Sequence, residues 1–152
     1  MNKPLKRHIS LQPVSREHHF GLLLCWKIRT GLKNDISPER IKKYVDWFYQ
    51  NHLVPHFSFE ENFVFPILGN KHTLIKKALE DHKIITEMVS QDNDLDLLLP
   101  RLERTIERHI RFEERILFNK IQDIATDEQL EEIESHHHEE AFQDNVDDVF
   151  WK

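Results

Sequence analysis

Four histidines each lie at the centre of an apolar stripe on an expected helix, and this placement constrains the fold more than any other feature of the chain. They are His18, His56, His82 and His109. When successive residues are placed about 100° apart around a helix axis, each imidazole points toward the apolar side and away from the charged side. A buried imidazole costs free energy unless a partner satisfies it. Four of them on four helices therefore predict a shared polar site inside a helical core.

Two of these histidines are followed four residues later by a glutamate on the same helix face. Glu60 follows His56, and Glu113 follows His109. Residues four apart lie about 6 Å from each other along the axis, so the imidazole can bind one metal ion while the carboxylate bridges to a second. Imidazole combined with carboxylate suits iron, manganese or zinc. Because bundle cores hold carboxylate-bridged dimetal sites, the pattern indicates such a centre here.

The chain divides into helices at recognisable boundaries. We expect helices over about residues 13–33, 38–66, 71–90 and 95–125. Ser37 and Pro38 fit the N-cap and the first position of the second helix. Pro55 should kink that helix just before His56, because proline lacks the amide hydrogen that a helix interior needs. Pro100 is tolerated only near the first turn of the fourth helix, which leaves the start of that helix open.

Short connections between long amphipathic helices imply antiparallel neighbours, so the sequence predicts an all-α, up-down-up-down four-helix bundle. Thr126 to Gln129 fit a capping box that begins a short fifth helix, which a tail follows. No internal repeat or long linker divides the chain. We therefore expect one domain over residues 1–152, with the bundle at about residues 10–125 and the C-terminal helix and tail at about residues 126–152.

Composition excludes several classes of protein. The 152 residues carry a net charge of −6 with histidine neutral, so no basic surface for nucleic acid is expected. No apolar run approaches the ~18–20 residues that span a membrane, and Met1 to Ser10 lack the apolar segment of a secretory signal. The single cysteine, Cys25, excludes an intramolecular disulfide. We expect a cytoplasmic protein that binds neither nucleic acid nor membrane.

At these residues the chain resembles the hemerythrin-like (HHE) family. The matching elements, in order, are His18 in Arg16-Glu17-His18-His19, His56-x3-Glu60, the lone His82, His109-x3-Glu113, and the flanking Phe63-Val64-Phe65-Pro66 and Ile116-Leu117-Phe118. The resemblance covers roughly residues 10–125. One His-x3-Glu is weak evidence, but two of them with two correctly placed lone histidines make a specific pattern.

The resemblance implies a hemerythrin-type bundle around a non-haem centre of two iron ions, with zinc or manganese as alternatives. It implies His18, His56, His82 and His109 as terminal ligands and Glu60 and Glu113 as bridges. The implied function is binding or sensing of dioxygen, nitric oxide or iron itself. One alternative is a redox enzyme that handles oxygen or peroxide, or donates iron for repair of iron–sulfur clusters. Another is a metal-stabilised module that binds a partner. All of these would use the same ligands, so the sequence does not separate them.

Two neighbouring histidines compete with the assigned ones. His19 projects about 100° away from His18, so we favour His18 as the residue of the first helix. His52 lies one turn before His56 and also points inward. It is either an extra ligand or a partly buried histidine with an ordinary partner, and we favour the second interpretation.

Other polar residues receive ordinary interpretations. Glu61 and Glu114 face about 100° from the proposed bridges, so we expect them at the surface or between helices. Cys25 is expected to be inert core packing. The run His136–His138 is expected on a solvated face, because three adjacent histidines on a helix point in three directions and cannot chelate one ion. The closing residues Val149–Trp151 should pack against the bundle.

The departure from the family pattern lies on the third helix. Oxygen-carrying hemerythrins resemble this chain but place a second histidine there, one turn from the first. The positions one turn either side of His82 are Ala78 and Thr86, and neither is a good iron ligand. We therefore expect an open coordination position at one iron. This puts stable, reversible oxygen carriage in doubt and favours redox or sensing chemistry.

Overall fold

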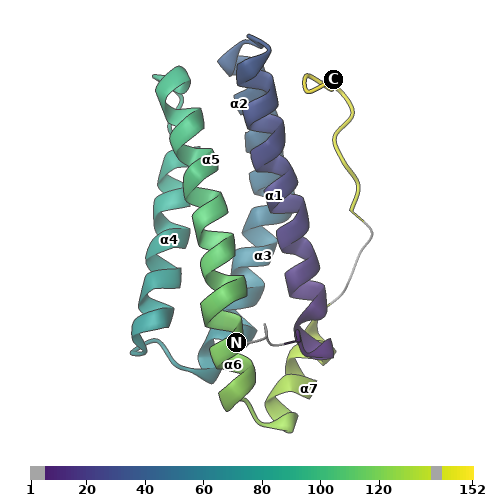
Figure 1. Ribbon diagram of the computed structural model, residues 1–152, viewed down its shortest axis with the longest axis vertical. Coiled ribbons are helices and arrows are strands. Elements are labelled where there is room, and N and C mark those ends of the chain that lie inside the picture. Colours follow the sequence, from purple (N-terminus) through teal and green to yellow (C-terminus); the bar gives the residue numbers. More distant parts are fainter. Residues whose placement is uncertain (1–5, 138–141) are drawn as a thin grey trace, which may run out of the picture.

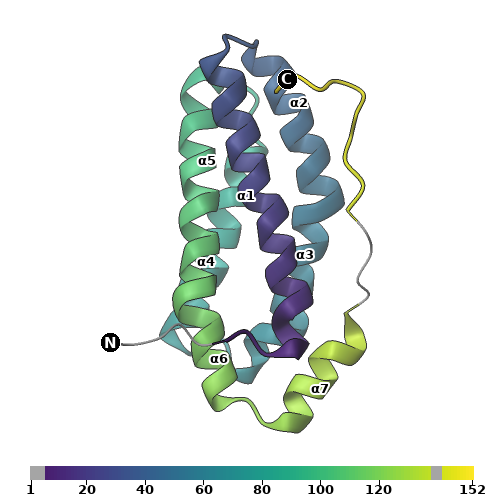
Figure 2. The ribbon, with the colours of Figure 1, turned by 45° about the vertical axis from the view of Figure 1, so that its right-hand side comes forward.

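The structure is a computed structural model that describes residues 6–137 and 142–152. Within these residues the regular secondary structure is entirely helical. Four helical runs lie side by side and alternate in direction (Figure 1 and Figure 2). The predicted all-α bundle is therefore confirmed. None of the helices in the described residues has the length and apolar character needed to cross a membrane.

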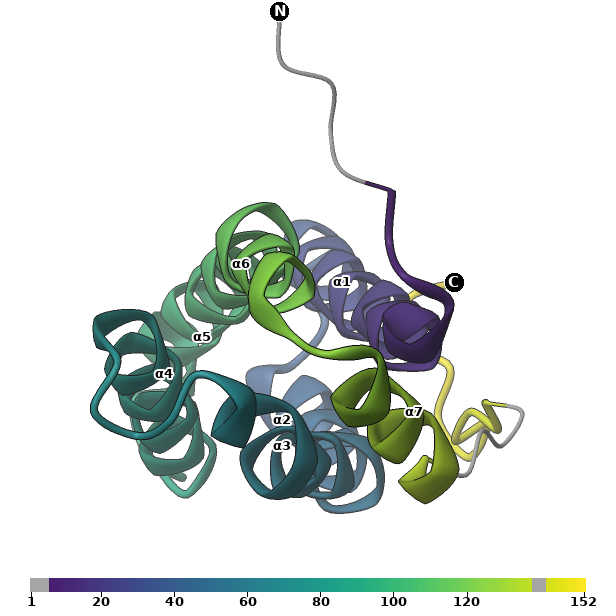
Figure 3. The same ribbon diagram turned by 90° about the horizontal axis from the view of Figure 1, so that it is seen from below.

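The four runs contain short 3₁₀-helical and π-helical segments, labelled η, as well as α-helix. The first run is η1 (Ile9–Leu11) and α1 (Gln12–Lys33). The second is α2 (Pro38–Phe48), η2 (Tyr49–Leu53), α3 (Val54–Phe59), η3 (Glu60–Val64) and η4 (Phe65–Ile67). The third is α4 (Thr73–Val89), and the fourth is α5 (Leu95–Phe112), η5 (Glu113–Leu117) and α6 (Phe118–Ile124). The fifth helix, α7 (Asp127–His136), lies at the lower end of the bundle against η1 and η3 (Figure 3).

Local sequence signals set several of these boundaries. Ser37 accepts a hydrogen bond from a backbone N–H of the first turn of α2, and Pro38 follows it as the first helical residue. Thr126 and Gln129 form the predicted capping box at the start of α7, each side chain accepting a bond from the backbone of the other.

Pro100 stands in the second turn of α5, because the helix begins at Leu95. We expected this proline near the first turn of the helix, and the structure places it one turn later. Its ring removes one helical hydrogen bond, the one that the carbonyl of Asp96 would accept. Asp96 is exposed, so water can satisfy that carbonyl.

Three π-helical turns, η2, η3 and η5, interrupt the α-helices. The turn η2 comes immediately before Pro55, and in it the N–H of Val54 bonds to the carbonyl of Tyr49, five residues back. The second run thus stays helical through Pro55. Proline has no amide hydrogen to donate, and the π-helical turn before it accommodates the hydrogen bond that is lost. The other two turns begin at Glu60 and Glu113, the two predicted bridging residues.

Two apolar clusters fill the bundle, one toward each end. The predicted site lies between them along the helix axes. In α4, for example, Ala78 belongs to the lower cluster, His82 follows it, and Ile85 belongs to the upper cluster. The core is therefore continuous apolar packing above and below a polar layer.

Residues 142–152, which we call the C-terminal strap, run along the outside of α1 and α2 back toward the upper end (yellow in Figure 1 and Figure 2). Phe150 is buried, as predicted for this end of the chain, and it contacts Gly31, where a Cβ atom would lie only 2.8 Å from the ring. Asp144 bonds to Lys27 and Tyr44. The strap is thus packed onto the bundle by apolar and charged contacts.

Candidate metal centre

The structure brings all six predicted site residues together in the polar layer. They are His18 in α1, His56 in α3, Glu60 in η3, His82 in α4, His109 in α5 and Glu113 in η5. None of these residues is more than 6% exposed. The neighbouring His19 is exposed, so the choice of His18 over His19 agrees with the structure.

The six residues form two groups of four that could each hold a metal ion. Site A contains His18 and His56, site B contains His82 and His109, and both include Glu60 and Glu113. Within each group the candidate ligand atoms lie within 4.8 Å of one another. The two carboxylates are therefore common to both sites, as a bridged pair of ions requires.

The distances show how the carboxylates join the two sites. The short Nε2–Oε1 distances are 3.1 Å from His18 to Glu113, 3.0 Å from His109 to Glu113, 3.3 Å from His56 to Glu60 and 3.2 Å from His82 to Glu60. Each carboxylate thus lies close to one imidazole of site A and one imidazole of site B.

Most of the inward-facing atoms have no hydrogen-bond partner among the described residues. The partnerless atoms are Nε2 of His56, His82 and His109, both carboxylate oxygens of Glu60, and Oε2 of Glu113. A buried polar atom without a partner costs about 1–3 kcal/mol. Imidazole nitrogen and carboxylate oxygen are the donors that iron, manganese and zinc accept. The residues present therefore fit bound metal ions.

Each imidazole is held from behind by a second carboxylate at its Nδ1 atom. The pairs are His56 with Glu17 at 2.8 Å, His82 with Glu61 at 2.8 Å, His109 with Asp81 at 3.0 Å and His18 with Glu114 at 3.1 Å. Each carboxylate accepts a hydrogen bond from Nδ1–H, so the proton stays on Nδ1 and the Nε2 lone pair points into the site. This is the arrangement that supports metal-binding histidines.

These four outer contacts form a closed ring around the bundle. The first run supplies the carboxylate for the second, the second for the third, the third for the fourth, and the fourth for the first. In every pair the carboxylate and the imidazole belong to different runs. The orientation of each imidazole therefore depends on the position of the preceding run.

Sequence reasoning missed part of this ring. Glu61 and Glu114 were expected at the surface or between helices. Each bonds to a histidine of another helix, and these histidine partners were not predicted. Glu17 and Asp81 were not identified at all. The available signal was an acidic residue directly beside four of the six predicted ligands, before the two lone histidines and after the two bridging glutamates.

The carboxylates hold protons on the imidazoles of the metal-free site. Burial alone would lower the pKa of His56, but attraction to Glu60 and the bond to Glu17 outweigh it and raise that pKa to about 9. Burial is likewise outweighed at His109, whose pKa rises to about 10 beside Glu113 and Asp81. Metal binding must therefore displace protons from the site.

Two other candidates lie outside both groups. Cys25 is buried, its Sγ donates to the carbonyl of Glu103 at 3.4 Å, and burial raises the pKa of the thiol to about 12. It is packing, as expected. His52 is half-buried with its ring 4.6 Å from that of Phe142 and 5.1 Å from that of Trp47, so it contacts aromatic side chains.

The histidines at the end of α7 differ in their exposure to solvent. His136 is exposed and stacks on Phe63 at 4.4 Å, which agrees with a solvated face. His137 differs, because its side chain is only 6% exposed and its Nε2 lies 3.5 Å from Oε1 of Glu17. The prediction was wrong for His137, since α7 folds back against η1 and η3. His138 lies outside the described residues.

The open coordination position expected at one iron stays a prediction, because Ala78 and Thr86 flank His82 and supply no ligand. Thr86 is exposed and accepts a hydrogen bond from the hydroxyl of Tyr49 at 3.0 Å. The ring of Phe57 stacks on His82 at 3.8 Å, and that of Phe65 lies at 5.5 Å. Aromatic side chains therefore cover His82, and Thr86 is turned away from the site.

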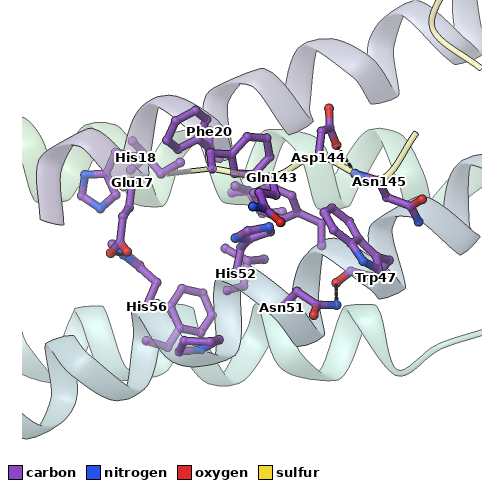
Figure 4. A pocket seen from close by; sticks show the side chains of 18 of the residues that line it. Glu17, His18, Phe20, Trp47, Asn51, His52, His56, Gln143, Asp144 and Asn145 are labelled. Atoms are coloured by element: carbon purple, nitrogen blue, oxygen red, sulfur yellow. Dashed lines mark hydrogen bonds and ion pairs between the residues drawn. The ribbon is translucent and has the colours of Figure 1, made fainter. Parts of the chain in front are cut away.

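The site is instead reached from the other side. A cavity of about 1060 Å³ is lined by His18, His56, His109 and the C-terminal strap. Figure 4 shows His18 and His56 at one end of it and strap residues such as Asn145 at the other. Both imidazoles of site A border this cavity, whereas only one of site B does. Access from outside therefore favours site A.

No protein-family model, curated protein or solved structure matches this chain.

Proposed function

We propose that this chain is a hemerythrin-like, non-haem di-iron protein that binds or senses a small diatomic molecule, dioxygen or nitric oxide. The observation that carries the proposal is the pair of four-residue groups sharing Glu60 and Glu113. A site for one ion needs only one of these groups. Two buried carboxylates placed between two pairs of imidazoles favour two ions held side by side.

The chain would hold the ions with four imidazole nitrogens and two bridging carboxylates. Iron, when bound, supplies reversible electron transfer and affinity for diatomic ligands. The outer carboxylates keep the proton on each Nδ1 and fix the ring orientation. Phe57 stacks on His82 and Phe118 stacks on His18, so aromatic rings exclude water from two sides. Small ligands would enter through the cavity beside site A.

A redox enzyme that handles oxygen or peroxide is the second candidate. One observation favours it, namely that the cavity beside site A is far larger than a diatomic molecule. Such space suits a second reactant beside the metal ions, which a carrier or sensor does not need.

Metal analysis and optical spectroscopy test the proposal. Protein produced with ample iron should contain two iron ions per chain after gel filtration. The anaerobically reduced protein should change its absorption spectrum when oxygen or nitric oxide is added, because either ligand alters the iron environment. Zinc-loaded protein is the control, and it should bind two ions without any spectral change.

The possible outcomes separate the parts of the proposal. One ion per chain, or none, would contradict the dimetal centre. Two zinc ions with no uptake of iron would keep the dimetal centre and contradict the iron chemistry. Two iron ions that respond to neither gas would contradict the diatomic ligand.

A further inference from the structure

The cavity beside site A has the size of a site for an organic molecule. Its volume is about 1060 Å³, and typical sites for small molecules occupy about 300–1,000 Å³. It lies between α1, the second helical run and the C-terminal strap (Figure 4). A diatomic ligand would leave almost all of this volume unused.

Aromatic rings form much of its outer wall. Phe20 of α1 and Phe142 of the strap stack at 4.2 Å, and His52 lies 4.6 Å from Phe142. Trp47 lines the same cavity from α2, as Figure 4 shows. Farther in, aliphatic side chains such as Ile106 continue the apolar lining. Flat aromatic molecules gain binding free energy from well-placed ring contacts beyond that from the area that they bury.

The lining disfavours an anionic ligand. No lysine or arginine is among the described residues that line the cavity, so the imidazoles are the only groups among them that can carry a positive charge. The imidazoles at the inner end are each paired with two carboxylates. Of the carboxylates in the wall, Glu17 is engaged by His56 and Asp144 by Lys27 and Tyr44, whereas Asp147 of the strap is exposed and has no ion pair among the described residues.

A few polar groups could orient a neutral ligand at the outer end. The side chains of Asn51 and Gln143 line the cavity near His52 (Figure 4). The amide nitrogen of Asn51 donates to the carbonyl of Trp47 at 2.8 Å, which leaves the amide oxygen as an acceptor for a hydroxyl group.

We infer that this cavity binds a small, neutral, planar aromatic molecule that carries a hydroxyl group, of the size of a one- or two-ring phenol. Aromatic walls on two elements, the absence of lysine and arginine from the described lining residues and the amides at the outer end all favour this class over organic anions and over aliphatic chains. The inference goes beyond the proposed function, because the aromatic rings and amides at the outer end belong to side chains other than the metal-binding ones.

The test is calorimetric titration of the zinc-loaded full chain with 2-naphthol, 2-naphthoate and decahydro-2-naphthol. We expect 2-naphthol to bind at least tenfold more tightly than either of the others. Naphthoate has the same rings with a negative charge, and decahydronaphthol has the same hydroxyl without aromatic faces. Equal affinity for naphthoate or for the saturated alcohol, or no binding of 2-naphthol, would overturn the inference.

Paired variants locate the binding. Trp47→Ala should weaken 2-naphthol binding at least tenfold, whereas Trp26→Ala, which removes an exposed tryptophan outside the cavity, should leave it unchanged. Asn51→Trp places a large ring at an exposed position of the rim and should block entry without disturbing the core. Binding that survives both cavity variants would place the ligand elsewhere and overturn the inference. Because zinc replaces iron here, failure of the iron chemistry does not affect this result.

Discussion

Single residues in the polar layer divide into carboxylates that serve both sites and carboxylates that hold one imidazole. Glu60 lies near imidazoles of both sites, whereas Glu61 bonds only to Nδ1 of His82. We expect Glu60→Ala to lose both metal ions. Glu61→Ala should keep them with about 10–100-fold weaker affinity, as for other residues that support a metal ligand.

The measurement is metal content after dialysis against graded concentrations of a chelator. Glu80→Ala is the matched control, because Glu80 is an exposed glutamate on α4 and should have no effect. If Glu61→Ala lost metal as completely as Glu60→Ala, then Glu61 would be a ligand itself and the assignment of outer and inner carboxylates would be wrong.

The sequence predicted the inner residues better than the outer ones for a physical reason. His18 and His82 belong to apolar stripes, so the period of one helix is enough to point them inward. Glu17 and Asp81 lie about 100° away on the same helices, where a single-helix argument places them at the surface. Their partners are on neighbouring helices, and only the packing of the bundle brings Glu17 to His56.

Among the structural elements, the C-terminal strap has one buried and one exposed ion pair. Asp144 bonds to Lys27, which is 3% exposed, whereas Asp148 bonds to the exposed Arg40. Asp144→Asn leaves a buried ammonium without its carboxylate, so we expect a loss of about 1.5–3 kcal/mol in the free energy of unfolding. Asp148→Asn, the control, should have a much smaller effect because solvent screens the pair. Urea unfolding measures both, and equal losses would contradict the assigned role of Asp144.

The same contact gives the strap a pH dependence. Burial raises the pKa of Asp144, but the bonds from Lys27 and Tyr44 outweigh it and leave that pKa below its ordinary value of 3.8. The contact therefore contributes fully above pH 3.8 and is lost as the pH falls through the lower pKa of the folded state. Hydrogen exchange of residues 142–152 should be slower in the unaltered protein than in Asp144→Asn at neutral pH. That difference should disappear in strong acid, and a difference that persisted there would contradict the mechanism.

Element boundaries were predictable where a local signal exists, as at Ser37 and Thr126. The wide turns were not, because a π-helical turn differs from an α-helical one by a single backbone bond and leaves no distinct residue pattern. Pro55 marked the location of one of them but not its form. The cavity was also beyond prediction, since its outer wall is the strap, and nothing in the sequence fixes where that segment lies.

At the scale of the whole molecule, the polar layer divides the apolar core into two clusters, so bound metal should stabilise the entire fold. Each ion at about 100 times its dissociation constant adds at least roughly 2.7 kcal/mol by linkage, so the first ion alone sets a lower bound. For a chain of this size, that raises Tm by roughly 5–10 °C. Calorimetry of metal-free and zinc-loaded protein at neutral pH measures the shift. Glu60→Ala with the same zinc is the control and should show little change, and equal Tm values for the two forms of the unaltered protein would contradict the linkage.

The overall architecture followed from the sequence because its determinants are distributed over the whole chain. Apolar periodicity in each run and short connections between runs are enough to specify a helical bundle. The end of the chain was less predictable. His137 contacts Glu17 because α7 folds across the lower end of the bundle, and that direction depends on the turn at Ala125 rather than on the period of the helix.

The ring of outer carboxylates also sets the electron affinity of the proposed centre. Six carboxylates contact the four imidazoles, so their formal charge balances two trivalent ions and exceeds that of two divalent ions. Such an environment disfavours added electrons, and iron held here should rest in the ferric state in air with a low midpoint potential.

Glu61→Gln removes one negative charge and keeps a hydrogen-bond acceptor for His82, so mediated redox titration should find a higher midpoint potential. Solvent at the partly exposed Glu61 will make the rise in midpoint potential modest. An unchanged or lower midpoint potential would mean that the outer carboxylates orient the imidazoles without affecting the reduction of the iron.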